Sequence, residues 1–422
     1  MATQSQTAPP APMTFRAVLG LTVMRRVWYA QLVSLLGDFL ALFAVISVVT
    51  YRMHGTPAQV TGVQISYMLP LAILGPLSGV FVDRWPLKPT LVASDLIRAV
   101  LVLFLFVTTT MWEIYVVLCL LSCVSSFFGP AQSVTIRSHV PPDGLISANA
   151  LMQMAMMGTR VIGPAAAGVL VAAFGPRVCY ALDVVSFVVS AALISSVAML
   201  RPPAAAAPGG PATDRGRIGA ILHEMGAGMR FIVHHAAISF VVMAMAAGLF
   251  VIGCFGPLIA IYVRDWLHAK SGVFGIVSAM VGTGMMFGMP AVRRLSGSVS
   301  NSTLVLAGLA GIGLGALLLG AFTFVPTALL ATFTLGFTFA GVIVPAQTLM
   351  QRETPHALMG RISSTVMSVV FFAQLLGLVL SGVLAQIFGV RTVFFLCAIL
   401  AWMLTAAGKL LLDAAPHAAP ST

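Results

Sequence analysis

The sequence predicts an all-α integral membrane protein with twelve transmembrane helices in two pseudo-symmetric six-helix bundles. Only 8% of the 422 residues are charged and 59% are hydrophobic, whereas a soluble domain carries about 25% charged residues. Apolar runs of the ~20 residues needed to cross a bilayer recur along the whole chain. We expect spans at residues 27–51, 59–82, 89–111, 114–136, 145–174, 178–200, 236–263, 272–292, 302–323, 325–349, 357–387 and 391–413.

Two long stretches of the chain share residues at the same spacing. The motif Pro-Ala-Gln occurs at 130–132 and again at 345–347, and the string Gly-Val-Leu follows at 168–170 and at 382–384. The separation of the two Gly-Val-Leu strings, which we call the repeat distance, is about half of the 422-residue chain. A duplicated membrane half is typical of transporters built on an internal repeat. The repeat therefore indicates a transporter.

A linker separates the two halves. Residues 201–217, RPPAAAAPGGPATDRGR, are rich in Pro, Gly and Ala, which favours a flexible connection. Apolar residues recur at helical spacing in 218–235, which predicts a short amphipathic helix on the cytoplasmic membrane surface. We therefore expect an N-terminal six-helix half at 1–200, a cytoplasmic linker with this helix at 201–235, and a C-terminal six-helix half at 236–422.

The net charge of +11 is explained by membrane topology. With the N-terminus inside, fifteen of the 22 Lys and Arg residues are assigned to cytoplasmic segments and five to external ones. This distribution follows the positive-inside rule, so we expect membrane lipids with anionic headgroups as partners, and no nucleic acid. The five basic residues on external segments are Arg52, Arg177, Arg264, Lys270 and Arg391.

The sequence carries no catalytic or metal-binding motif. The phosphate-binding pattern G-x-x-x-x-G-K-[ST] is absent, and His223-Glu224 lacks the second histidine of H-E-x-x-H. No nucleophile elbow occurs, and the five cysteines lie within or at the edges of apolar spans without the spacing of a metal site. We expect no enzyme activity, no cofactor and no metal, so that a gradient or the substrate itself supplies the energy.

The loop between the second and third spans resembles a motif of the major facilitator superfamily, G-x-x-x-D-R-x-G-R-R/K. The chain keeps Gly79, Asp83, Arg84 and Lys88, with Pro86-Leu87 in place of a glycine and a basic residue. The resemblance implies the major facilitator fold. It also implies that Asp83, Arg84 and Lys88 act in gating, by latching the two halves together in one state of the transport cycle.

Further stretches resemble the bacterial macrolide-efflux and enterobactin-exporter branch of that superfamily. They are Leu36-Gly37-Asp38, Ser94-Asp95-Leu-Ile-Arg98-Ala, Ala148-Asn149-Ala150-Leu151 and Leu182-Asp183-Val-Val-Ser186-Phe187. In the fifth span, Gly158, Gly163-Pro164 and Gly168 are similar to the superfamily's antiporter motif, with Ala167 where a second glycine is common. The resemblance implies a monomeric, multi-pass protein of the bacterial inner (cytoplasmic) membrane, with both termini cytoplasmic.

Two ionisable residues lie near the middle of spans, where a charge costs about 2.5–3.5 kcal/mol. Asp38 lies near the midplane of the first span, and no basic residue neighbours it in sequence. It is suited either to proton or cationic-substrate coupling, or to structural pairing with another helix, for example through Arg160. Arg160 always keeps its charge, so it is expected to bind an anionic substrate group or to hold Asp38 ionised.

Three further ionisable residues are expected to form structural pairs. Asp95 and Arg98 lie three residues apart on one helical face, which predicts a local ion pair that assists the gating loop. Asp183 is expected near the external end of the sixth span, where it pairs or caps a helix.

These features together predict a secondary active transporter that uses alternating access. The expected activity is proton-coupled efflux of drug-like amphiphiles or siderophore-type compounds, with a small-molecule substrate and protons as partners. A lipid or lysolipid translocator, or an importer, fits the same fold. A transport-inactive membrane regulator is the alternative from another class, and flux and ligand-binding assays separate these possibilities.

Overall fold

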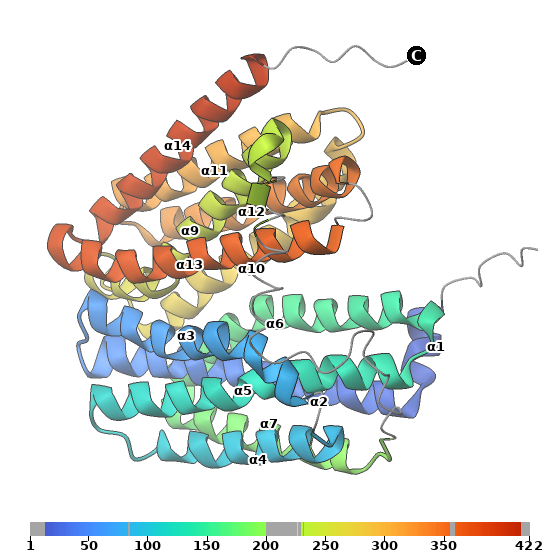
Figure 1. The fold of residues 1–422 in the computed structure, drawn as a ribbon. Coiled ribbons are helices and arrows are strands. Elements are labelled where there is room, and N and C mark those ends of the chain that lie inside the picture. Colours follow the sequence, from blue (N-terminus) through green and yellow to red (C-terminus); the bar gives the residue numbers. More distant parts are fainter. Residues whose placement is uncertain are drawn as a thin grey trace, which may run out of the picture. The chain divides into compact units, whose positions relative to one another are not determined.

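The computed structural model describes residues 13–82, 85–199, 226, 229–230, 232–354 and 359–414. Within them, a short helix α1 (Phe15–Gly20) precedes twelve long helices, and no strand occurs in these ranges. The twelve are α2 (Thr22–Ser47), α3 (Pro57–Val82), α4 (Leu87–Phe104), α5 (Met111–His139), α6 (Leu145–Phe174), α7 (Pro176–Ser195), α9 (Ala236–Asp265), α10 (Ser271–Leu295), α11 (Asn301–Ala321), α12 (Val325–Glu353), α13 (Met359–Phe388) and α14 (Val390–Ala414) (Figure 1).

Eleven helical segments of the described chain are long and apolar enough to cross a membrane. The twelfth long helix, α4, contains three charged residues, Lys88, Asp95 and Arg98. Because α4 is only 18 residues long, all three charges fall within any segment of it that could cross a membrane. The structure thus has the twelve long helices that were predicted, and eleven of them contain a segment long and apolar enough for a membrane span.

The third predicted span, 89–111, is wrong at its end. Helix α4 ends at Phe104, and a turn leads to Thr110, the residue that caps α5. Thr110 accepts a hydrogen bond from the backbone N–H of Glu113, and the Glu113 carboxylate accepts one from the backbone N–H of Thr110 at 3.0 Å. This capping box begins a new helix within the apolar run. Hydropathy separated the two spans but placed the end of the first one too late.

The chain folds into two compact units. Unit 1 comprises Met1–Ala44, Ser66–Gly163 and Phe174–Ala206, and unit 2 comprises the remaining segments, Val45–Ile65, Pro164–Ala173 and Ala207–Thr422. In unit 1, α4 packs against both α5 and α7, and Figure 1 shows these helices side by side. The last three residues of α2, the start of α3 and the end of α6 therefore group with the C-terminal helices in unit 2. Of the predicted linker, 201–235, residues 201–225, 227–228 and 231 lie outside the described residues, and short helical stretches occur at 229–230 and 232–234.

The sequence repeat is also present in the backbone geometry. Among the described residues, left-handed φ values occur at His54 (49°) and His268 (48°), and at Gly175 (84°) and Gly389 (86°). The members of each pair are separated by the repeat distance, as the two Gly-Val-Leu strings are. A left-handed φ is uncommon for any residue other than glycine. Its recurrence at both histidines therefore indicates that the two halves share the same loop conformation.

The repeat recurs in the packing of unit 2. A Cβ atom added to Gly168 of α6 would lie 2.7 Å from the Cα atom of Gly275 in α10, and one added to Gly382 of α13 would lie 2.8 Å from the Thr61 side chain in α3. Gly168 and Gly382 are separated by the repeat distance, and so are Thr61 and Gly275. The same helix-to-helix contact is therefore made twice, and in both cases a glycine permits the close approach.

Candidate functional site

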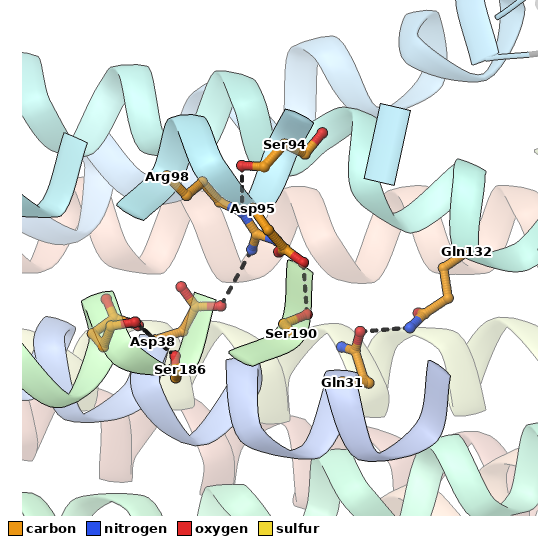
Figure 2. A network of polar contacts seen from close by, with 9 residues as sticks. Gln31, Asp38, Ser94, Asp95, Arg98, Gln132, Ser186 and Ser190 are labelled. Carbon is orange, nitrogen blue, oxygen red and sulfur yellow. Dashed lines mark hydrogen bonds and ion pairs between the residues drawn. The ribbon is translucent and has the colours of Figure 1, made fainter. Parts of the chain in front are cut away.

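A buried cluster of charged and hydroxyl side chains lies in unit 1, where α2, α4 and α7 meet (Figure 2). Helix α2 contributes Asp38, and α4 contributes Asp95 and Arg98 from one face, because residues three apart on a helix are neighbours. Helix α7 contributes Asp183 and Ser190, which lie on one face because residues seven apart are separated by about two helical turns. The cluster therefore joins three helices through polar side chains.

Arg98 lies at the centre of the cluster. Its Nη2 atom donates to Oδ1 of Asp95, its Nη1 atom lies 3.7 Å from Oδ2 of Asp38, and its Nε atom donates to the Ser94 carbonyl at 3.3 Å. The second carboxylate oxygen of Asp95 accepts a hydrogen bond from the Ser190 hydroxyl at 2.6 Å. The Asp95–Arg98 pair predicted from the spacing is thus present, and Arg98 connects it to α2.

Two aromatic rings enclose the Arg98 guanidinium group. Its Cζ atom lies 4.7 Å from the ring centre of Phe128 in α5 and 4.3 Å from that of Phe187 in α7. The Arg98 side chain is only 4% exposed. Stacked rings attract a cation, but they do not replace the water that a charge loses on burial. The carboxylates around Arg98 are therefore needed to stabilise its charge.

Asp38 and Asp183 lie beside a close contact between α2 and α7. A Cβ atom on Gly37 would lie 2.2 Å from the Ser186 Oγ atom and 2.5 Å from Oδ1 of Asp183, so that only glycine fits there. Asp183 is 1% exposed, and its carboxylate accepts a hydrogen bond from Ser186 at 3.3 Å. The Asp38 side chain, by contrast, is 20% exposed. Asp38 is therefore the accessible acid of the cluster.

The cluster contains more acids than bases. Three carboxylates, of Asp38, Asp95 and Asp183, lie in it, and Arg98 is the one basic side chain that the described contacts place there. If all three acids were ionised, two negative charges would lack a countercharge, and an uncompensated buried charge is costly. The arrangement is therefore chemically suited to bind and release protons.

A second polar contact lies on α2, two turns before Asp38. The Gln132 side chain of α5 donates to the Gln31 side chain at 2.6 Å (Figure 2). Gln31 lies seven residues before Asp38, which places both on one face of α2. Gln132 belongs to the repeated Pro-Ala-Gln motif, so this part of the repeat holds α5 against α2.

Comparison with known proteins identifies the family. A sequence model of the Major Facilitator Superfamily matches residues 27–374 and 241–422. The chain belongs to the major facilitator superfamily. It is 27% identical to the uncharacterised MFS-type transporter YfiS of Bacillus subtilis, over 89% of each chain. It is 23% identical to macrolide efflux protein A of Streptococcus pyogenes, over 88% of this chain and 91% of that protein.

Solved structures of transporters share the fold of this superfamily member. A variant of the peptide transporter POT aligns with a TM-score of 0.71 at 11% identity, over 96% of each chain. A variant of the nucleoside transporter NupG aligns with a TM-score of 0.69 at 15% identity, over 92% of this chain and 99% of that one. At such low identity the likeness concerns the fold, which confirms the predicted major facilitator fold.

The remaining predicted residues lie elsewhere. Arg160, near the middle of α6, is exposed and forms no ion pair with a described residue. The ion-pair partner of Asp38 is therefore Arg98, and not Arg160, which was the example offered from the sequence. Lys88 is half-buried in the first turn of α4, and it too forms no ion pair within the described part of the chain. Asp83 and Arg84 of the superfamily loop lie outside the described residues.

The glycines of the α6 motif differ in their surroundings. A Cβ atom on Gly163 would lie 2.8 Å from the Phe39 side chain of α2, whereas one on Gly158 would meet no atom within 4 Å. Pro164 lies inside the helix, and its carbonyl would lie 2.8 Å from a Cβ atom on Gly275. Gly163 thus packs within unit 1, and Pro164 and Gly168 pack on α10 within unit 2.

No group of three His, Cys, Asp or Glu side chains in the described ranges is arranged to hold a metal ion. All five cysteines are free thiols.

Sequence reasoning missed the α7 side of the cluster. Asp183 was expected to pair or cap near the helix end, but it lies buried against Gly37. Ser186 and Ser190 follow it at spacings of three and seven, and all three are buried. This polar face of an otherwise apolar helix was the available signal, because a helix in lipid rarely carries one without a partner.

Proposed function

We propose that this member of the major facilitator superfamily is a proton-coupled exporter of drug-like amphiphiles or siderophore-type compounds, and that it works by alternating access. The observation that carries the proposal is the Arg98 cluster, in which Asp38 and Asp95 share one guanidinium group and the buried Asp183 lies beside Gly37, next to Asp38. The likeness to macrolide efflux protein A supports the outward direction of transport. The glycine motif of α6, similar to that of antiporters, supports exchange against protons.

Asp38 is the coupling acid in this proposal. Asp95 makes two direct contacts, with Arg98 and Ser190, and its side chain is fully buried. Asp38 lies 3.7 Å from Arg98 and is partly exposed, so it is held less firmly and is open to exchange. A proton reaching the cluster therefore binds Asp38 before Asp95.

Protonation of Asp38 changes the connection between α2 and α4. When Asp38 is ionised, its carboxylate attracts Arg98 and holds the two helices together. When Asp38 carries a proton, that attraction is lost and Arg98 pairs with Asp95 within α4 alone. The position of α2 relative to α4 thereby becomes sensitive to the proton, which is what coupling to a conformational change requires.

Gating is assigned to the loop before α4 and to the cluster itself. Asp83, Arg84 and Lys88 carry the gating role that the superfamily motif implies. Asp95 and Arg98 lie two and three helical turns after Lys88 on the same helix. Helix α4 thus joins the gating loop to the proton site, and a movement of one is transmitted to the other.

Everted membrane vesicles test the proposal. Vesicles that contain the protein are energised to form a pH gradient, and a panel of amphiphiles is added. A cargo should dissipate the gradient in vesicles with the wild-type protein and should accumulate only while the gradient is present. Asp38→Asn should abolish the gradient dependence, whereas Glu113→Gln, on an exposed side chain at the start of α5, should preserve it. If Asp38→Asn leaves flux and coupling unchanged, Asp38 is not the coupling acid.

A further inference from the structure

Helix α6 presents two exposed faces of opposite character. Met154, Ile162 and Val169 are 59%, 59% and 62% exposed, and their spacings of eight and seven residues place them on one face. Asn149, Gln153 and Arg160 are also exposed, and their spacings of four and seven place them on another. Ile162 follows Arg160 by two residues, so that the apolar and polar faces point in nearly opposite directions.

The apolar face suits lipid and the polar face does not. A charged side chain halfway along a membrane helix is costly against hydrocarbon, and Arg160 lies near the middle of α6. An exposed face that carries Asn, Gln and Arg side chains is therefore suited to water and polar solutes rather than to lipid. Arg160 is the charged group of this polar face.

Arg160 has no countercharge within the described part of the chain. The described ion pairs of acids are those of Asp38 and Asp95 with Arg98, and of Asp265 with Arg264. No hydrogen bond from Arg160 to another described residue is present either, so among these residues it is a fixed positive charge with the five donors of its guanidinium fork available. Such a fork matches the geometry of a carboxylate or phosphate group.

The equivalent face of the C-terminal half lacks the charge. Positions one repeat distance later, on α13, carry Gln374 in place of Arg160 and Met367, 62% exposed, in place of Gln153. The backbone geometry of the two halves is repeated at His54 and His268, so the difference is one of side-chain chemistry on a shared scaffold. A role in helix packing would not need the charge in one half alone.

We infer that the Asn149–Gln153–Arg160 face of α6 binds the anionic group of the transported amphiphile. Arg160 pairs with a carboxylate-type group, and Gln153 and Asn149, two and three turns before it on the same face, contact polar groups elsewhere on an extended amphiphile. Met156, 36% exposed and one turn from Arg160, offers the adaptable apolar contact that an amphiphile needs. The inference rests on the proposed export function and narrows its cargo to organic anions.

Binding of a matched pair of probes tests this assignment without a gradient. Dansyl-undecanoate and its methyl ester share one apolar body and differ in the anionic group. Fluorescence titration of the purified protein in detergent should give binding of the acid about tenfold or more tighter than binding of the ester, as expected for a charge-assisted hydrogen bond. Arg160→Gln should remove this preference while leaving affinity for the ester unchanged. Arg160→Lys should keep part of the preference, since it retains the charge without the fork.

Two controls separate the possible failures. Arg177→Gln removes an exposed positive charge at the start of α7 and should leave the preference intact. Asp38→Asn should lose proton coupling in vesicles but keep the preference for the acid. If the wild-type protein binds both probes equally or binds neither, or if Arg160→Gln keeps the preference, the anion site is not on this face. Absence of proton-coupled flux in wild-type vesicles, with the preference intact, would contradict the proposed exchange mechanism only.

Discussion

Replacement of Arg98 by leucine tests how the buried cluster holds unit 1 together. The substitution removes the contacts of Arg98 with Asp95, Asp38 and the Ser94 carbonyl, and it leaves acids buried without a cation. Breaking a buried ion pair by removing one partner costs about 3–5 kcal/mol. The two aromatic contacts also stabilise Arg98, since a cation–π contact is worth about 2 kcal/mol when the cation is desolvated. We therefore expect Arg98→Leu to lower the free energy of unfolding by at least about 3 kcal/mol.

The assay is unfolding of the purified protein by addition of a denaturing detergent to mild micelles, followed by circular dichroism. Arg177→Leu, which removes an exposed arginine from α7, serves as the matched control and should change little. Adding Asp95→Asn to Arg98→Leu should restore part of the loss, because it removes the stranded charge. Equal unfolding midpoints for Arg98→Leu and Arg177→Leu, or strict additivity of Asp95→Asn with Arg98→Leu, would refute the reasoning.

Two further predictions concern glycines. Gly37→Ala should lower the free energy of unfolding by about 1–3 kcal/mol, because the added Cβ atom would lie 2.2 Å from Ser186 Oγ. Gly158→Ala should instead raise the free energy of unfolding by about 0.5–1 kcal/mol, because no atom lies within 4 Å of its Cβ position. The same detergent titration measures both, and equal shifts would contradict the close contact. Gly175→Ala and Gly389→Ala should each lower the free energy of unfolding by about 1–3 kcal/mol. Their φ values of 84° and 86° are readily adopted by glycine but are strained for alanine. A large effect at one site and none at the other would show that the repeated loops are not equivalent.

Local spacing predicted part of the candidate site. Asp95 and Arg98 lie three residues apart in one apolar span, and a buried pair at that spacing follows from helical geometry. The ion-pair partner of Asp38 could not be predicted from local spacing, because it depends on how the rest of unit 1 places α2 against α4. Arg98 and Arg160 were both available in sequence as partners, and only the packing at Gly37 and around Phe128 selects Arg98.

The fold was predictable for similar reasons, and with similar gaps. Apolar runs and the repeat were sufficient for twelve helices in two halves, because a membrane requires helices of that length. The end of α4 was not predictable in this way, because Leu105 and Phe106 continue the apolar run past Phe104, whereas the next helix is capped only at Thr110. Capping by hydrogen bonds, rather than hydropathy, sets that boundary.

Infrared difference spectroscopy of the purified protein tests the central claim most directly, that Asp38 binds and releases a proton beside Arg98. Spectra recorded in acidic and alkaline buffer should differ by the C=O stretching band of a protonated carboxyl group. The account predicts that Asp38→Asn removes this band and that Glu113→Gln leaves it in place. A band of the same size and pH dependence in Asp38→Asn and wild-type protein would contradict the account.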